Sequence, residues 1–175
     1  MVEPLARSFA PLLPPGAPSP SSARILVLGS MPGRASLDAQ QYYAHPRNAF
    51  WPIVVAYCGI DRASDYPTRV QALLDAGIAL WDVLAQCRRP GSLDSAIELD
   101  EAQPNAVAEL LDAHPTITRV CCNGAAAATL YRRFGLPGAP RVELIQLPST
   151  SPAHAGMSLA EKMRRWHAAL SPDMP

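Results

Sequence analysis

The sequence predicts a three-layer α/β/α sandwich built on a four-stranded parallel sheet. Three short segments, at 25–28, 78–81 and 120–122, are almost continuously apolar, as expected for strands that helices cover on both faces. A fourth segment, 142–147, alternates between apolar and polar residues, which suits a strand at the sheet edge. Helical patterns separate these segments, and strands that alternate with helices are typical of a parallel sheet.

The expected helices each carry a recognisable start or end signal. They run from Asp65 to a stop at Gly77, from Pro104 to just before Pro115, over 125–134, and from Ser158 onward. Proline favours the first helical turn, and glycine favours the position after the last. In the final helix, Ser158 and Glu161 have the spacing of a capping box. We expect this helix to bury one apolar face formed by Leu159, Met163, Trp166 and Leu170.

The 175 residues suffice for one well-packed domain, which we place at 23–172. Residues 1–22 hold six prolines. Because proline fixes its φ angle and lacks an N–H donor, we expect this segment to be an extended arm that forms neither a helix nor a strand ladder. Phe9, Leu12 and Leu13 could hold part of the arm against the domain surface.

Charge and cysteine content exclude several classes of protein. Fifteen basic and fifteen acidic residues give no net charge, which argues against binding nucleic acid by bulk charge. The single lysine, Lys162, follows no glycine-rich phosphate loop. The four cysteines lack zinc or iron–sulfur spacing, so we expect buried thiols, no metal and a reducing cytoplasm. We find no membrane-spanning stretch and no signal peptide.

Two of the expected strands end in loops with unusual chemistry. Residues 29–33 form a Gly-Ser-Met-Pro-Gly turn whose backbone amides could face an anion or a carbonyl oxygen. Residues 147–154 place three hydroxyls between two prolines, a rigid arrangement suited to gripping a phosphodiester. Either segment could also be an ordinary turn. In parallel sheets, ligands bind outside the carboxyl ends of the strands, so these loops mark the expected site.

The segment 40–51 mixes aromatic and polar residues. Core packing explains Phe50 and Trp51, but not the polar His45, Arg47 and Asn48 among them. An aromatic platform beside an amide and a hydroxyl-lined loop suits a flat, polar, uncharged ligand such as a nucleobase.

These motifs, in this order, resemble those of the uracil-DNA glycosylase superfamily. They are Gly-Ser-Met-Pro-Gly at 29–33, Tyr-Tyr-Ala-His-Pro-Arg-Asn-Ala-Phe-Trp at 42–51, Gly-Ile-Ala-Leu-Trp-Asp-Val-Leu at 77–84, Asn-Gly at 123–124 and Leu-Pro-Ser-Thr-Ser-Pro at 147–152. The nearest branch is the hypoxanthine-DNA (deoxyinosine) glycosylases, family 6. The resemblance, over 8–170, implies that a base flipped from double-stranded DNA is hydrolysed from its sugar without a cofactor.

Two departures from the superfamily pattern guide the catalytic assignments. Met31 stands where many members carry a water-positioning acid or Asn, so we assign the attacking water to Asn48. Leu147 stands where the best-known uracil enzymes carry a His that stabilises the departing uracil. Losing that electrophile disfavours uracil and makes a purine leaving group more plausible.

Two further residues are catalytic candidates. Asp82 could donate a proton to a purine ring nitrogen if burial raises its pKa, or could simply cap a turn. His45 is a candidate acid, or a brace for its loop.

The remaining assignments follow from the resemblance by position. Tyr43, or Tyr42, would stack on the flipped base, and Asn123 would read its edge or only shape a turn. The expected base-binding set is Ser30, Met31, Tyr42, Tyr43, Phe50 and Asn123. The expected phosphate-binding set is Gly33, Arg47, Ser149, Thr150, Ser151 and His154. We expect residues 153–157 to wedge into the duplex.

Two alternatives stay open on the sequence alone. One is a mismatch-type uracil-DNA glycosylase, and the other is a module that binds a nucleobase or nucleotide without catalysis. In either case we expect a monomer. For the glycosylase, we expect a basic face with Arg34, Arg47 and Arg164–Arg165, and an acidic back that includes Asp94 and Glu98. Lys162, expected on the charged side of the last helix and outside the site, favours hydrolysis over lyase chemistry.

Overall fold

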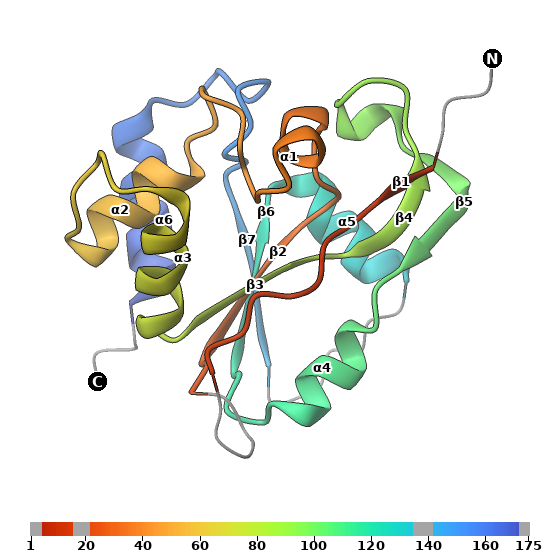
Figure 1. Ribbon diagram of the computed structural model, residues 1–175. Coiled ribbons are helices and arrows are strands. Elements are labelled where there is room, and N and C mark those ends of the chain that lie inside the picture. Colours follow the sequence, from red (N-terminus) through yellow and green to blue (C-terminus); the bar gives the residue numbers. More distant parts are fainter. Residues whose placement is uncertain (1–4, 16–21, 135–141, 172–175) are drawn as a thin grey trace.

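A four-stranded parallel sheet forms the centre of the computed structural model, which describes residues 5–15, 22–134 and 142–171 (Figure 1). Its strands are β2 (Ile25–Gly29), β3 (Ile78–Asp82), β6 (Arg119–Asn123) and β7 (Glu143–Leu147), in the order β3-β2-β6-β7. All neighbouring pairs are parallel, with Ile25 opposite both Ile78 and Arg119. The predicted fold class is therefore confirmed, with β7 at one edge.

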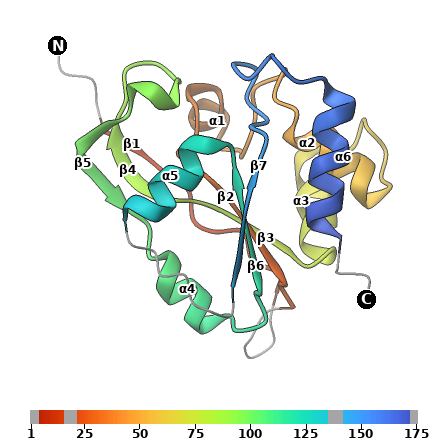
Figure 2. The same cartoon turned by 180° about the vertical axis from the view of Figure 1, so that it is seen from behind.

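Helices cover both faces of this sheet (Figures 1 and 2). One face is covered by α2 (Phe50–Cys58), α3 (Tyr66–Asp75) and α6 (Leu159–Leu170), and the other by α4 (Val107–Ala113) and α5 (Ala125–Arg133). Alternating strand residues supply the two cores: Val27 and Leu80 pack with the first group of helices. Leu26 and Ala79 pack with the second.

A second, three-stranded antiparallel sheet lies beside the first and was not predicted. It consists of β1 (Ala6–Arg7), β4 (Leu84–Arg88) and β5 (Glu98–Pro104), in the order β1-β4-β5. A short 3-10 turn, η1 (Asp94–Ala96), lies between β4 and β5. Only Val83 separates β3 from β4, so the chain passes directly from one sheet to the other.

The expectation that the arm forms no ladder is wrong. Ala6 pairs with Cys87 in β4, and Leu12 exchanges backbone hydrogen bonds of 2.8 and 3.0 Å with Leu80. The prolines remove only their own N–H donors, and the N–H groups of Ser8 and Leu12 remain free to pair. Phe9, Leu12 and Leu13 pack against the two cores as expected.

Several helix boundaries differ from the expectation. The side chain of Asp65 caps α3, but Pro104 ends β5, and α4 begins at Val107. Proline is tolerated there because β5 is an edge strand. In α6, Ser158 Oγ accepts from the Glu161 N–H at 3.2 Å, as the capping box predicts.

Other side chains of α6 lie differently than expected. Leu159 is exposed and Lys162 is buried, which reverses their predicted placement. Elsewhere, Cys87, Cys121 and Cys122 are buried thiols, while Cys58 is only half-buried. Across the described ranges, no helix has the length and apolar character needed to cross a membrane.

Candidate active site

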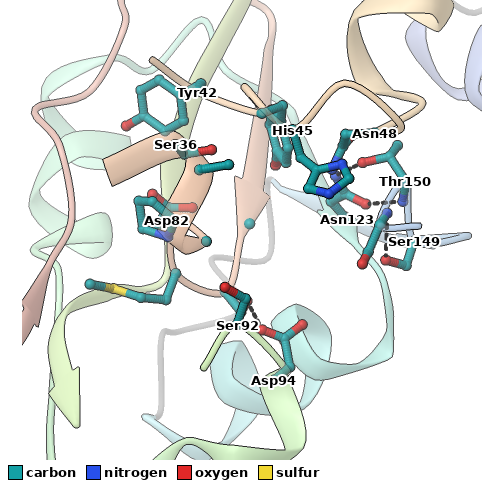
Figure 3. A pocket seen from close by; sticks show the side chains of 18 of the residues that line it. Ser36, Tyr42, His45, Asn48, Asp82, Ser92, Asp94, Asn123, Ser149 and Thr150 are labelled. Carbon is teal, nitrogen blue, oxygen red and sulfur yellow. Dashed lines mark hydrogen bonds between the residues drawn. The ribbon is translucent and has the colours of Figure 1, made fainter. Parts of the chain in front are cut away.

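A pocket lies where the carboxyl ends of the four parallel strands meet (Figure 3). Its cavity of about 150 Å³ is many times the roughly 10–15 Å³ that a single water needs. Most of the predicted site residues line it: Ser30, Met31, Gly33, Tyr42, Tyr43, His45, Asn48, Asp82, Asn123, Ser149, Thr150 and Ser151. Figure 3 shows Asp82 on one side of this pocket and Asn48 on the other.

The turn after β2 is held by a charged pair from the second sheet. Ser30 Oγ donates to Asp94 Oδ1 at 2.5 Å. The buried guanidinium of Arg89 donates to the backbone oxygens of Met31 and Pro32, and its Nη1 lies 3.7 Å from Asp94 Oδ1. The loop between β4 and β5 therefore forms one wall of the pocket. Asp94, which was expected on an acidic back, lies in the site.

Asp82 ends β3 and is almost completely buried at 3% exposure. Its Oδ2 accepts from Ser8 Oγ at 3.2 Å, and a Cβ on Gly29 would lie 2.5 Å from its Oδ1. Glycine is therefore required at position 29 by the close approach of the carboxyl. Loss of solvation raises the pKa of Asp82 to about 7, although the hydrogen bond from Ser8 and the charge of Arg89 lower it.

The aromatic segment presents Tyr43 to the pocket and keeps Tyr42 fixed. The Tyr43 ring stacks on Phe50 with centroids 4.2 Å apart, and its φ of 53° is a strained value for a bulky residue. The Tyr42 ring is buried, and its hydroxyl donates to Ala10 O at 3.0 Å. Tyr43 is thus the better candidate for stacking on a base, while Phe50 supports it from behind and does not line the pocket.

Asn48 and His45 follow the aromatic pair in the same loop. Asn48 Oδ1 accepts from the Phe50 N–H at 2.9 Å, which fixes the amide at the start of α2. Within the described ranges, no protein acceptor takes the Asn48 Nδ2 hydrogens. His45 Nδ1 accepts from the Arg47 N–H at 3.1 Å, so this ring both lines the pocket and braces its loop.

The end of β6 and the loop after β7 are tied together by Asn123 and Thr150. Asn123 Nδ2 donates to Thr150 Oγ1 at 2.8 Å, and Asn123 Oδ1 accepts from the Thr150 N–H at 2.9 Å. Thr150 is 1% exposed, and its hydroxyl oxygen accepts from the Asn123 amide, so this side chain holds the loop. This pair gives Thr150 a role in holding the loop and favours the turn-shaping role for Asn123, while a phosphate contact of Thr150 stays a prediction.

Ser149 and Ser151 lie differently from Thr150. Each hydroxyl accepts a backbone N–H from two residues ahead at 3.2 Å and is half-buried. A hydroxyl that accepts in this way keeps its own proton for an outside acceptor. Their geometry therefore suits contact with phosphate oxygens.

Three expected site residues lie outside this pocket, and several others were missed. Phe50 lies behind Tyr43, while Arg47 and His154 are exposed and line an adjacent groove. The missed pocket residues are Ser36, Arg89, Ser92 and Asp94, and Arg34, which was expected on the basic face, also lines the pocket. Ser8 was also missed, because nothing in the sequence links it to a carboxyl 74 positions away.

The expected basic face and acidic back are only partly present. Arg164 and Arg165 both pair with Glu161, at 2.7 and 2.8 Å, on the exposed side of α6. Lys162 is buried, and its Nζ donates to His154 O at 2.8 Å, outside the pocket. Its long side chain points inward because the loop after β7 offers it an acceptor there.

Comparison with known proteins places this chain and its fold in one family. A family model described as the uracil DNA glycosylase superfamily matches residues 15–170, a range that begins after β1 and Ser8. A protein of Methanosarcina acetivorans named hypoxanthine DNA glycosylase is 34% identical over 84% of this chain and 90% of its own length. A protein of the same name from Methanosarcina barkeri is 38% identical over 59% of this chain. That alignment spans 65% of the relative, just under two thirds of its length.

A solved structure agrees with the sequence relatives. The solution NMR structure of a Methanosarcina acetivorans protein, provisionally classed as a uracil DNA glycosylase, superimposes with a TM-score of 0.74 at 30% identity. The superposition covers 95% of this chain and 96% of the other. The chain belongs to the uracil DNA glycosylase superfamily, a family of DNA-repair glycosylases.

Proposed function

We propose that this protein is a monofunctional DNA glycosylase that removes hypoxanthine from deoxyinosine in double-stranded DNA. The observation that carries the proposal is a pocket at the strand ends with a fixed amide, Asn48, on one side and a buried carboxyl, Asp82, on the other. The two relatives from Methanosarcina carry the name hypoxanthine DNA glycosylase, and the proposal extends that substrate to this chain.

Asn48 is the residue that positions the attacking water. Phe50 N–H occupies one lone pair of its Oδ1, which leaves the second lone pair to accept a hydrogen bond from water. The water oxygen bonds to the sugar C1′, and the C1′–N9 bond breaks with its electron pair going to the purine. One water proton ends on the released base, and the other remains on the new sugar hydroxyl.

The leaving group must be stabilised without the electrophile of the uracil enzymes. Leu147 is buried in the core and does not line the pocket. Asp82, whose pKa burial raises to about 7, lies at the far side of the pocket, where it can hydrogen-bond to the base. Because Leu147 supplies no electrophile to the pocket, the site favours a purine over uracil as the preferred substrate.

The DNA contacts belong to the same proposal. Ser149 and Ser151 would donate to phosphates beside the flipped nucleotide, with Arg47 and His154 further along the groove. The exposed loop 153–157 would fill the gap in the duplex. Lys162 lies outside the pocket, which supports hydrolysis without lyase chemistry. A monomer and a cytoplasmic location stay predictions.

Single-turnover excision tests the proposed activity directly. Oligonucleotide duplexes that carry deoxyinosine, uracil, xanthine or only normal bases are incubated with excess protein and then cleaved at abasic sites with alkali. We expect hypoxanthine release to be fastest. Release of none of these bases would overturn the glycosylase proposal and favour a nucleobase-binding module. Uracil release without hypoxanthine release would favour the mismatch-type uracil enzyme.

Two variants of Asn48 test its role. Asn48→Ala should lower the single-turnover rate about 100-fold, the usual effect of removing one key polar group. Asn48→Asp keeps an acceptor for both Phe50 N–H and water, so it should retain much more activity than Asn48→Ala. Thermal unfolding of both variants controls for damage to α2. Equal rates for Asn48→Ala and the wild type would assign the water to another group.

A further inference from the structure

The N-terminal strand β1 brings a hydroxyl to the carboxyl at the base of the pocket. Ser8 immediately follows β1, and its Oγ lies 3.2 Å from Asp82 Oδ2. We infer that Ser8 is a specificity-determining positioning residue, which occupies Oδ2 so that Asp82 always presents Oδ1 to the flipped base as a hydrogen-bond acceptor. This inference rests on the proposed function and names the chemical feature that the pocket requires of its base.

The backbone around Ser8 fixes the position of its hydroxyl. The Ser8 N–H donates to Ala85 O at 2.8 Å, and the neighbouring Phe9 O accepts from Trp81 Nε1 at 2.9 Å. Asn105 Nδ2 donates to Ser8 Oγ at 3.4 Å and also to Asp82 O at 2.9 Å. The arm is therefore held to the end of β3 by several contacts besides the hydroxyl itself.

The hydroxyl has two alternative acceptors. Ser8 Oγ lies 3.2 Å from Phe9 O as well as 3.2 Å from Asp82 Oδ2. A serine hydroxyl carries one proton and two lone pairs, so it donates to only one of these oxygens at a time. While Asn105 Nδ2 donates to one lone pair of Ser8 Oγ, the other lone pair can accept a second hydrogen bond.

This choice of acceptors lets Ser8 serve both charge states of Asp82. When Asp82 is ionised, Ser8 donates to Oδ2. When Asp82 is protonated, the proton sits on Oδ2 and donates to Ser8 Oγ, while the hydroxyl turns to Phe9 O. In both states Oδ1, which lies against Gly29 in the pocket wall, has no proton and can only accept.

A permanent acceptor at this point selects bases by their ring N–H. Hypoxanthine carries an N–H at N1, which Oδ1 can accept, whereas adenine carries a lone pair at N1. Two acceptors facing each other in a buried pocket lose a hydrogen bond and repel, so adenine is rejected. Guanine shares the N1–H, so this contact separates deaminated adenine from adenine and leaves guanine to other contacts. Asp82 then reads the base, in place of the proton-donating role expected from the sequence.

Other charged or titratable groups also face Asp82. Arg89, after β4, favours its ionised form, and Asp94 in η1 opposes it. Tyr42 and Tyr43 lie close enough for Asp82 to raise their own pKa values, and neither ionises before Asp82 does. Among the described residues, Ser8 is the neighbour whose side chain hydrogen-bonds to the carboxyl.

The test compares the pH dependence of hypoxanthine excision in the wild type, Ser8→Ala and Ser8→Thr. The wild type should stay active on both sides of pH 7, because Oδ1 accepts in either charge state. In Ser8→Ala, the proton is free to sit on Oδ1 and the ionised form has lost a donor. Its rate should fall about tenfold on the acid side and recover at alkaline pH, with a midpoint about one pH unit above the wild-type pKa of Asp82. Ser8→Thr keeps the hydroxyl and should restore the wild-type profile.

Two further measurements separate this role from simple docking of the arm. Leu12→Ala weakens the packing of the arm but leaves the hydroxyl in place, so it should lower stability without changing the pH profile. NMR titration of the Asp82 carboxyl carbon should show a higher pKa in Ser8→Ala than in the wild type. A Ser8→Ala profile that superimposes on the wild type, or the same pH effect in Leu12→Ala, would overturn the inference. A wild type that excises no base would instead refute the proposed function, and the NMR titration would still report on Ser8.

Discussion

At the scale of single residues, the carboxyl of Asp82 is deeply buried, and its neighbours only weakly replace the hydration that burial removes. Its neighbours supply one hydroxyl at 3.2 Å and a guanidinium that is mainly engaged with the backbone of residues 31–32. Loss of solvation therefore dominates and raises the pKa of Asp82 to about 7. A buried acid of this kind costs stability whenever it must ionise, and such costs concentrate at functional sites.

The stability of the fold should accordingly depend on Asp82 and on pH. Between its ordinary pKa of 3.8 and about 7, the unfolded chain has lost this proton while the folded chain keeps it. The folded state binds more protons in this range, so the contribution of Asp82 to the free energy of unfolding falls as pH rises. Asp82→Asn cannot ionise, and its stability relative to the wild type should rise by a few kcal/mol across the range, at ~1.4 kcal/mol per pKa unit.

Urea denaturation at several pH values measures this difference. Asp38→Asn, at an exposed carboxyl on α1 (Arg34–Ala39), serves as the matched control and should show no such trend. A constant difference between Asp82→Asn and the wild type would contradict the raised pKa.

At the scale of elements, α6 supports the loop expected to enter the duplex. The helix buries Lys162, and the ammonium donates to His154 O at 2.8 Å. Desolvation lowers the pKa of Lys162. The ammonium therefore holds a loop whose residues 153–156 are exposed and have few other attachments.

Replacing this lysine should loosen the loop more than the fold. Lys162→Met keeps the length of the side chain but removes the hydrogen bond. We expect faster amide hydrogen exchange at residues 151–157, with the global free energy of unfolding changed by less than about 1 kcal/mol. Arg164→Met, on the same helix but exposed and paired with Glu161, should leave the exchange unchanged. Unaltered exchange in Lys162→Met would show that the loop is held by other contacts.

The sequence predicted the elements whose formation depends on burial. The strands of the parallel sheet are apolar because helices cover both faces, and that pattern is visible locally. The strands β4 and β5 carry no such signal, since β5 is mostly charged or polar and exposed along an edge. They are specified by pairing with each other and with β1, and a pairing partner cannot be read from local composition.

The same difference between local burial and long-range strand pairing explains which site residues could be predicted. Residues that end the parallel strands were predictable, because the topology gathers strand ends at one edge. Arg89 and Asp94 line the pocket, and Ser8 contacts Asp82, from segments next to the strands of the unpredicted sheet, so their positions depend on an element that the sequence did not reveal. The loop-holding contact of Thr150 could not be predicted for a related reason, since its hydroxyl is bonded to Asn123 from another strand.

At the scale of the whole molecule, the zero net charge reflects acids placed close to bases. Arg88 pairs with Glu98 and Glu101, and Arg164 and Arg165 share Glu161. Near the pocket, Arg34 and Arg47 are exposed, while Arg89 is buried beside Asp94. Near the pocket, the charge available to neutralise DNA phosphates therefore comes from a small number of exposed arginines such as Arg34 and Arg47.

The affinity for DNA should fall only moderately with salt. With two to four phosphate contacts, the slope of log affinity against log salt should be about −2 to −4. Fluorescence anisotropy with the Asn48→Ala protein and a deoxyinosine duplex measures it without cleavage. Arg47→Ala should reduce the slope by about 1, whereas Arg165→Ala, already paired with Glu161, should leave it unchanged. A slope typical of a polybasic protein would contradict this charge arrangement.

The pairing of β1 with β4 also sets the order in which the pocket can be completed during synthesis. Ala6 and Ser8 leave the ribosome before their partners Cys87 and Asp82, which follow more than seventy residues later. At translation rates of about 5–20 residues per second, the arm waits roughly 4–16 seconds for its partners. Asp82 thus obtains its hydroxyl partner only once both segments have been made, and in a nascent chain that ends before β4 the β1 segment has no strand to pair with.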